Sequence, residues 1–236
     1  MEVTALLNTY EGIHGPQHRV REFIDFLHGN KTPLIQGGKK SKNLPKKYNI
    51  IVMDPPWPYK ARRMAQKKGK HIAGIEDEYD TMTMQDMMNL PIDNMCAKNC
   101  LLYLWCTGPK LKEAFKLFDA WNFQYSTVAY VWEKKVPNMG FYSFSSCEYV
   151  LVAKRGKAPP RNKSINFRQF YQEKRTSHSK KPERIQDMIE QQFDLKGLKK
   201  IEVFARRFRK GWDCIGNEIN GTIQDFLNGK KMKLKK

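Results

Sequence analysis

Short apolar runs alternate with segments of helical spacing along most of this chain. Residues 49–53 (NIIVM) are an almost wholly apolar run with β-branched side chains, and residues 100–106 are apolar throughout. Runs of this length, bounded by turn residues, are typical of strands buried on both faces of a parallel sheet. Helices are expected over residues 84–96, where Pro91 interrupts the pattern, after Gly108 and Pro109, and over residues 182–193. Further strands are expected over residues 125–132, 147–153, 200–205 and 214–215.

This order of elements predicts the fold class. Strands that alternate with helices favour an α/β fold, with a mostly parallel sheet covered by helices on both faces. A chain of 236 residues is long enough for one such domain and short for two. We expect an accessory helical segment over residues 1–30, a single domain over residues 31–225 and a basic tail over residues 226–236.

The first apolar run stops at Asp54, Pro55, Pro56 and Trp57. A proline cannot donate to a strand ladder, so Asp54 is expected at the carboxyl end of a strand, where open α/β sheets bind ligands. These residue types suit methylation of an exocyclic amine on a nucleobase: Asp54 and the Pro55 carbonyl would accept hydrogen bonds from the amine, and Trp57 would stack on the base. We expect Asp54 to act as an acceptor at its ordinary pKa. A strand followed by a rigid turn with a half-buried Trp explains these four residues equally well.

The balance of charge points to the kind of partner. The chain has 43 Lys and Arg against 24 Asp and Glu, a net charge of +19. Neutralising phosphates releases counterions, so this excess predicts a nucleic acid, and a solvated basic surface is the less favoured alternative. Basic side chains gather in residues 59–77, directly after the proposed turn, and we expect Lys60, Arg62 and Arg63 to hold phosphates beside a flipped base. A solvated loop that becomes ordered on the substrate is compatible with this role.

Cysteine spacing and hydropathy argue against a metal-binding, membrane-spanning or secreted protein. The five cysteines form no CxxC pair and have no ligand-spaced histidines near them, so no metal site is expected and an intracellular location, cytoplasm or nucleus, is favoured. The most apolar run has seven residues, too few to span a bilayer. The start of the chain, with Glu2 and no basic segment, is unlike a signal peptide.

A second group of candidate residues lies far from Asp54 in the sequence. Lys181 precedes the expected helix over residues 182–193, and a lysine at a helix N-terminus suits a carboxylate such as the amino-acid end of a methyl donor. Asn217 and Glu218 follow a short strand, where α/β cofactor sites place the group that binds ribose hydroxyls. Taken singly, Lys181 and Glu218 would more often be plain surface residues.

Together these segments resemble a known family, the adenine-N6 methyltransferases named for the methyltransferase-A subunit of the mRNA adenosine enzyme. The resemblance runs from about residue 49 to residue 221 and depends on the whole ordered set, because a lone DPPW would not be specific. The matching segments are DPPW at 54–57, YDTM at 79–82, LYLW at 102–105, WNF at 121–123, CEYVL at 147–151, HSKKP at 178–182, EVFAR at 202–206, GWD at 211–213 and GNE at 216–218.

The resemblance implies a class I, Rossmann-like methyltransferase fold that uses S-adenosylmethionine (SAM). By position, residues 54–57 would hold the target adenine against the donor methyl group. Tyr79 and Glu148 would line the pocket of the acceptor adenosine.

The resemblance also implies a set of cofactor residues. Lys181 would face the SAM carboxylate or the acceptor nucleoside, and Arg206 would anchor the ribose side of the cofactor. Asn217 and Glu218 would bind the ribose hydroxyls. Glu202 would support the strand near the cofactor.

The resulting hypothesis is a SAM-dependent methyltransferase that acts on the N6 amine of adenine in a nucleic acid. DNA is favoured over RNA because the chain lacks the zinc fingers and long extensions of the relatives that act on mRNA. Two alternatives stay open: an RNA adenosine N6-methyltransferase, and a catalytically silent subunit that binds nucleic acid. A homodimer, or a heterodimer with a related subunit, is compatible with either.

Overall fold

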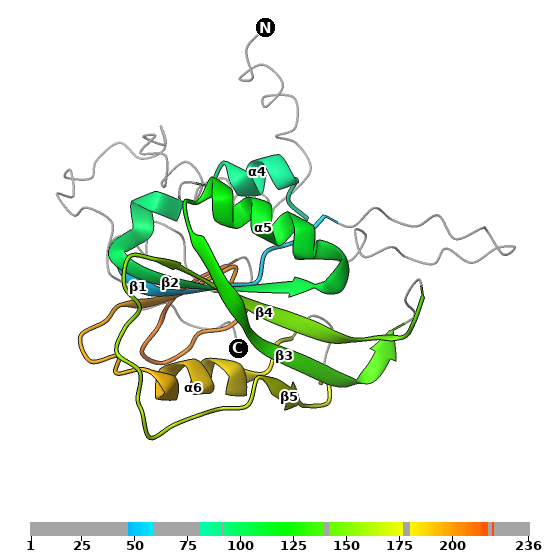
Figure 1. Ribbon diagram of the computed structural model, residues 1–236. Coiled ribbons are helices and arrows are strands. Elements are labelled where there is room, and N and C mark those ends of the chain that lie inside the picture. Colours follow the sequence, from blue (N-terminus) through cyan, green and yellow to red (C-terminus); the bar gives the residue numbers. More distant parts are fainter. Residues whose placement is uncertain are drawn as a thin grey trace, which may run out of the picture.

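The computed structural model describes the central part of the chain (Figure 1). The accessory segment expected over residues 1–30 and the basic tail expected over residues 226–236 lie outside the described residues, so both stay predictions. No helix among the described residues is long and apolar enough to cross a membrane. The described residues are 47–58, 81–90, 92–138, 142–176, 180–216 and 219.

A seven-stranded sheet forms the body of the molecule, in the order β5-β3-β4-β2-β1-β6-β7. Each expected strand of the described region is present, as are the helices expected after Gly108 and Pro109 and over residues 182–193. The helix expected over residues 84–96 was predicted too long, because it ends at Met88, a 3-10 helix covers residues 92–95 and Cys96 already belongs to a strand. Strand β5 is an addition that its three residues gave no reason to expect. The elements are β1 (Tyr48–Met53), α4 (Met84–Met88), η2 (Ile92–Met95), β2 (Cys96–Thr107), η3 (Gly108–Lys110), α5 (Leu111–Ala120), β3 (Gln124–Asn138), β4 (Ser145–Arg155), β5 (Phe170–Gln172), α6 (Glu183–Gln192), β6 (Lys200–Val203) and β7 (Asp213–Ile215).

The sheet is mostly parallel, as expected from the sequence. Strand β1 is parallel to β2 and β6, β6 is parallel to β7, and β3 is parallel to β5. Among the described strands, β4 alone runs against the others, because it pairs antiparallel with both β2 and β3. Strands β3 and β4 follow each other in the chain as a hairpin, and a hairpin pairs its strands antiparallel.

Strand β1 occupies the position at which the strand order reverses. The chain passes from β1 through α4 to β2, which lies on one side of β1. It later passes from β5 through α6 to β6, which lies on the other side of β1. Open α/β sheets bind their ligands at such a switch point, outside the carboxyl ends of the strands. We call this region the carboxyl edge: the C-terminal ends of β1, β2 and β6, at Met53, Thr107 and Val203.

Two hydrophobic cores explain why the first apolar run shows no alternation. Helices α4 and α5 cover one face of the sheet and α6 covers the other (Figure 1). Successive side chains of a strand point to opposite faces, so Ile51 and Met53 pack in the core of α4 and α5, whereas Ile50 and Val52 pack in the core of α6. All four are at most 2% exposed. A strand covered on both faces needs apolar residues at every position.

A close backbone contact fixes the chain where it leaves β6 and β7. The Ala205 N–H donates to the Ile215 carbonyl at 2.8 Å. A Cβ atom at Gly216 would lie 1.9 Å from the Ala205 carbonyl oxygen, which is far inside van der Waals contact. Glycine is therefore required at position 216 by the close approach of two backbone segments.

We expect Gly216→Ala to lower the free energy of unfolding by about 3 kcal/mol, because the Ala205 backbone must move to admit the new methyl group. The matched control is Gly197→Ala. Gly197 has a φ of +77°, and a Cβ atom added there would meet nothing within 4 Å, so only backbone strain of about 1 kcal/mol is expected. Urea unfolding of the two variants measures both values, and an equal loss in both would contradict the steric account.

Candidate active site

A tight turn after β1 holds Asp54 at the carboxyl edge. The Trp57 N–H donates to the Pro55 carbonyl at 2.8 Å, and the Met82 N–H donates to the Pro56 carbonyl at 3.0 Å. Both prolines also restrict the backbone through their fixed φ. The strand therefore ends where the sequence predicted, and the Asp54 side chain is 21% exposed at the end of a rigid segment.

Trp57 is more buried than the sequence suggested. Its side chain is 5% exposed, and its indole N–H donates to the Trp105 carbonyl of β2 at 3.0 Å. The ring packs in the core that also contains α4 and α5. Trp57 thus anchors the turn to the neighbouring strand, and its stacking on a base stays a prediction.

Four charged side chains of alternating sign form a chain beside this turn. The Lys181 Nζ lies 2.8 Å from Asp54 Oδ2 and 3.3 Å from Glu148 Oε2. The second oxygen of Glu148 lies 3.3 Å from Lys134 Nζ. We call these residues, in the order Lys134, Glu148, Lys181 and Asp54, the charge chain. It joins β3, β4, the segment before α6 and the end of β1.

Aromatic rings support the central lysine. The Lys181 Nζ lies over the Trp105 ring, 5.6 Å from its centroid, and the Trp105 and Trp132 rings meet edge to face with centroids 6.2 Å apart. An ammonium over an aromatic face is attracted by the negative face of the ring. The position of Lys181 is therefore set by two carboxylates and one ring.

Burial and the neighbouring charges change the acidity of these groups. Burial raises the pKa of Asp54, and Lys181 and Arg206 offset only part of this rise. Burial also acts to raise the pKa of Glu148, but Lys181 and Lys134 outweigh it and hold that pKa below its ordinary value. The expectation that Asp54 works at its ordinary pKa is therefore wrong, because the sequence does not show how deeply the carboxylate lies.

Lys134 was not identified from the sequence. The residue is 4% exposed, and it is one of two buried polar or charged residues among those described. The register between β3 and β4 shifts after Glu133, and Lys135 has a φ of +56°. A shift of this kind re-aims a side chain, and a non-glycine residue in the left-handed region stores strain that recurs at functional sites. No local pattern in the sequence signals such a shift.

Glu202 and Arg206 come from β6 and the turn after it. The Gln186 side-chain N–H of α6 donates to Glu202 Oε2 at 2.8 Å, and burial raises the pKa of Glu202. Glu202 therefore joins β6 to α6, and its expected role of supporting the strand near the cofactor stays a prediction. Phe204 has a φ of +62°, which turns the chain sharply after β6. Arg206 follows this turn, and its charge acts to lower the pKa of Asp54.

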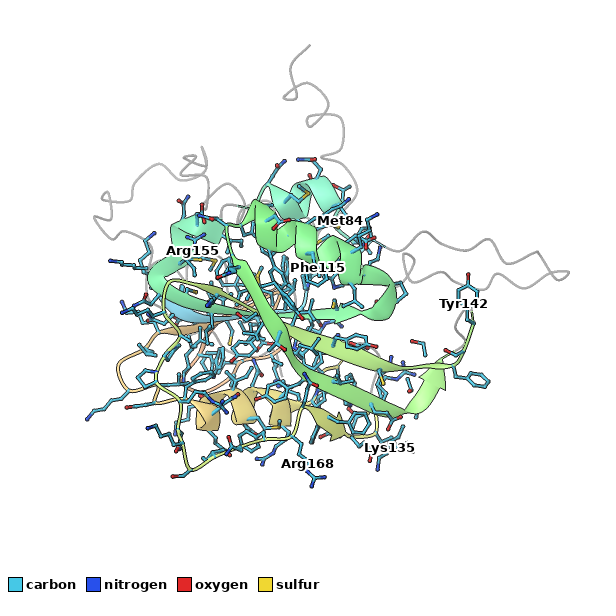
Figure 2. The ribbon with its side chains drawn as sticks, viewed as in Figure 1. Met84, Phe115, Lys135, Tyr142, Arg155 and Arg168 are labelled. Atoms are coloured by element: carbon cyan, nitrogen blue, oxygen red, sulfur yellow. The ribbon has the colours of Figure 1, made fainter. Side chains whose placement is uncertain are left out.

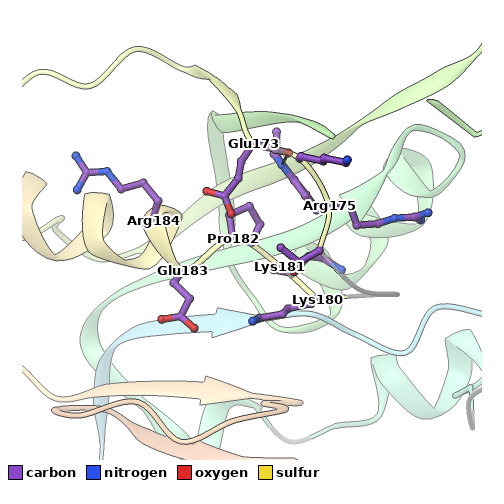
Figure 3. Close-up of a pocket in the computed structure, with 10 residues that line it drawn as sticks. Glu173, Arg175, Lys180, Lys181, Pro182, Glu183 and Arg184 are labelled. Atoms are coloured by element: carbon purple, nitrogen blue, oxygen red, sulfur yellow. Dashed lines mark hydrogen bonds between the residues drawn. The ribbon is translucent and has the colours of Figure 1, made fainter. Parts of the chain in front are cut away.

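A basic pocket of about 220 Å³ lies at the start of α6 (Figure 3). We call it the α6 pocket. Asp54 and Glu148 do not line it, so it adjoins the charge chain through Lys181 alone. Pro182 caps α6 without a side-chain hydrogen bond, which leaves the first backbone N–H groups of the helix for another acceptor. The pocket is lined by Trp132, Glu173, Lys174, Arg175, Thr176, Lys180, Lys181, Pro182, Glu183 and Arg184.

These residues fit a cofactor that carries a carboxylate. The α6 pocket combines cationic side chains with a helix N-terminus, which is suited to an anion. Lys181 has three N–H donors, and the two carboxylates of the charge chain occupy two of them. Gly216 brings the backbone close at the end of β7, on the same edge of the sheet.

Several expected site residues lie outside the described residues, so their roles stay predictions. These are the three phosphate-binding candidates, the tyrosine of the expected acceptor pocket and the two ribose-binding candidates. Within the described part of the chain, no group of three or more His, Cys, Asp and Glu side chains could hold a metal ion. The undescribed candidates are Lys60, Arg62, Arg63, Tyr79, Asn217 and Glu218.

Comparisons with known proteins show which family the chain is similar to. The model of the MT-A70 family matches residues 48–218, from the first residue of β1 to just past β7. A type II methyltransferase of Mycoplasma sp, M.MunI, is 38% identical over 185 residues, which cover 74% of this chain and 78% of that protein.

More distant similarity extends to mammalian proteins. The human N(6)-adenine-specific methyltransferase METTL4 is 26% identical over 200 residues, or 75% of this chain and 38% of that protein. The mouse protein of the same name is 25% identical over 199 residues. Because the family match covers most of the chain and begins at the strand that leads into Asp54, the chain belongs to the MT-A70 family of adenine-N6 methyltransferases.

Proposed function

We propose that this chain methylates the N6 amine of adenine in DNA. The proposal depends on the ion pair between Asp54 and Lys181. This pair lies at the carboxyl edge, next to the turn that Pro55 and Pro56 make rigid. DNA is supported by the similarity to M.MunI over 78% of its length, because type II methyltransferases are DNA-modifying enzymes. The net charge of +19 suits a polyanionic substrate. A DNA substrate also favours an intracellular location.

The amine of adenine is a poor nucleophile because its lone pair is delocalised into the ring. Hydrogen bonds from both amine hydrogens to fixed acceptors favour the pyramidal nitrogen of the transition state. A carboxylate offers about four acceptor sites, so Asp54 can accept from the amine while it binds Lys181. The Pro55 carbonyl already accepts the Trp57 N–H, and its second lone pair remains for the other amine hydrogen.

The cofactor of the family is SAM, which supplies a methyl group on a positively charged sulfur when it is bound. Lys181, Arg206 and the α6 pocket are the described groups that would hold it, and Asn217 and Glu218 remain the proposed partners of its ribose. Glu148 is the second carboxylate that contacts the Lys181 ammonium group and so helps to fix it. Lys134 in turn neutralises Glu148, so two carboxylates and two ammonium groups balance at the site.

The direct test uses the wild-type protein with labelled SAM and either duplex DNA or RNA of the same sequence. We expect N6-methyldeoxyadenosine in the DNA and little product in the RNA, measured by mass spectrometry of the nucleosides. Product in RNA alone would replace DNA by RNA as the substrate. If neither carries product and calorimetry detects no binding of SAM, the silent-subunit alternative would stand instead.

We expect Asp54→Asn to reduce kcat for methyl transfer to DNA by about 10²- to 10³-fold, because it removes the charged acceptor of the amine. SAM binding, measured by calorimetry, should change little. Asp119→Asn, an exposed carboxylate on α5, is the matched control and should behave like the wild type. Full activity of Asp54→Asn would contradict the assigned role of Asp54.

The charge chain makes a prediction about pH. Asp54 must be ionised to accept the amine, and its pKa is raised, so activity should fall with decreasing pH at a higher pH than an ordinary Asp would require. Lys134→Met removes a cation that lowers the pKa of Glu148, so Glu148 should protonate at a higher pH and release Lys181. We expect the acid limb of the kcat profile to move to higher pH and kcat to fall about 10- to 100-fold.

The control for this experiment is Lys134→Arg, which keeps the positive charge and should restore most of the activity and the acid limb. The KM for SAM should change less than kcat in Lys134→Met, because Lys134 acts through Glu148 and does not line the α6 pocket. If the pH profile of kcat for Lys134→Met has the same acid limb as that of the wild type, Lys134 serves only for packing.

A further inference from the structure

Strands β3 and β4 extend beyond the rest of the sheet at the carboxyl edge (Figure 1). The last residue of β2, Thr107, pairs with Glu148, and β5 pairs with β3 only as far as Glu133. Beyond these positions, among the described strands, the two pair only with each other, up to the pair of Asn138 and Ser145. We call this projecting part, residues 133–138 and 142–147, the ribbon.

Two aromatic side chains stand at the outer end of the ribbon. Tyr142 is 102% exposed and Phe144 is 70% exposed, the two highest values among the exposed large hydrophobic residues described. Figure 2 shows Tyr142 away from the body of the sheet. Phe115 and Tyr125, in contrast, are less exposed and contact each other, with ring centroids 4.9 Å apart. Single exposed apolar residues are ordinary, but two rings at one projecting tip favour a binding role.

The ribbon tip lies within reach of the charge chain. Phe144 is four residues from Glu148, which is at most about 14 Å of extended chain. Bases stack about 3.4 Å apart in duplex DNA, so this reach spans about four base steps. The ribbon is also fixed at its base, because Lys134 ends in the charge chain and the Lys135 N–H donates to the Glu133 carboxylate at 2.9 Å. The base of the ribbon is therefore held at a set position relative to Asp54.

The surroundings of the ribbon suit the backbone of DNA. The Arg175 N–H donates to the Lys134 carbonyl at 3.2 Å, so the segment that lines the α6 pocket runs beside the base of the ribbon. Lys135 is exposed on the ribbon itself. Among the described residues, Lys174 and Lys180 of the pocket make no ion pair with an acidic side chain. Cations of this kind beside an aromatic tip combine phosphate attraction with stacking.

We propose that Tyr142 and Phe144 insert into the base stack of duplex DNA beside the target adenine. This inference rests on the proposed DNA substrate. An adenine must leave the duplex before its amine can reach Asp54, and opening the stack costs free energy. Apolar wedges that enter between base steps offset that cost by replacing the lost stacking. The ribbon would perform this step, and the charge chain would hold the amine afterwards.

The test compares duplex DNA with DNA in which moving the adenine out of the base stack costs little free energy. The double variant Tyr142→Ala with Phe144→Ala should lower kcat/KM on the duplex by at least about tenfold, since stacking of one base on an aromatic ring has roughly this effect. On the single strand, or on a duplex with an abasic site opposite the adenine, the loss should be about twofold or less. The fluorescence of 2-aminopurine at the target position should rise on binding of the wild type and stay low with the variant.

Two control variants complete the design. Tyr142→Phe keeps a ring at the tip and should retain wild-type activity on the duplex. Phe115→Ala removes an exposed ring from α5 and should leave the ratio of duplex to single-strand activity unchanged. Urea unfolding of all variants checks that the fold is intact.

Other outcomes would overturn the proposal. Wild-type activity of the double variant on the duplex excludes the wedge, and an equal loss on both substrates assigns the rings to general binding. If sedimentation shows a wild-type dimer that the double variant loses, the tip contacts a second copy of the chain instead. Failure of the proposed function looks different, because the wild type would then methylate no DNA substrate at all.

Discussion

The site depends on one ammonium group held between two carboxylates. Two partly buried carboxylates repel each other unless a cation lies between them, and the Lys181 Nζ lies 2.8 Å from Asp54 and 3.3 Å from Glu148. Removing one partner of a buried ion pair costs on the order of 3–5 kcal/mol, because the other charge is left uncompensated. The four members of the charge chain therefore define each other's positions, although they come from distant parts of the sequence.

The sheet brings these side chains to one edge. Strand β1 delivers Asp54 at the switch point, and β4 runs against its neighbours, so its first residues lie at the same edge as the last residues of β1 and β2. This reversal explains how Glu148, near the start of β4, can contact the same ammonium group as Asp54, which follows the end of β1. A strand parallel to β2 at this position would carry the same residue to the opposite edge of the sheet.

Methylation of the adenine amine needs hydrogen-bond acceptors rather than a strong base that removes a proton. An exocyclic amine can keep its protons until the methyl group has arrived, so the site needs fixed hydrogen-bond acceptors in a partly water-excluded position. Burial of Asp54 serves this need, and the raised pKa is its consequence. Lys181 compensates by keeping a positive charge beside the carboxylate, and burial of that charge is in turn tolerated because Glu148 and Asp54 both contact it.

Sequence alone determined the features that depend on local covalent geometry and periodicity. It identified a strand buried on both faces, its end at two prolines and an acid at its carboxyl end, because proline stops a ladder whatever surrounds it. It also placed most helices and strands of the described region, but it made the helix at residue 84 too long and the strand at residue 125 too short. The ordered motifs indicated the family, which the comparisons then confirmed.

Tertiary structure decided how the side chains meet. The position of Lys134 in the charge chain follows from a register shift and a left-handed residue, both set by pairing between strands. The burial of Trp57 depends on a carbonyl of β2, 48 residues away. Strand β5 exists because β3 offers it an edge, since its three residues carry too little pattern to specify a strand. Each of these features depends on contacts between residues distant in the chain, which no local spacing encodes.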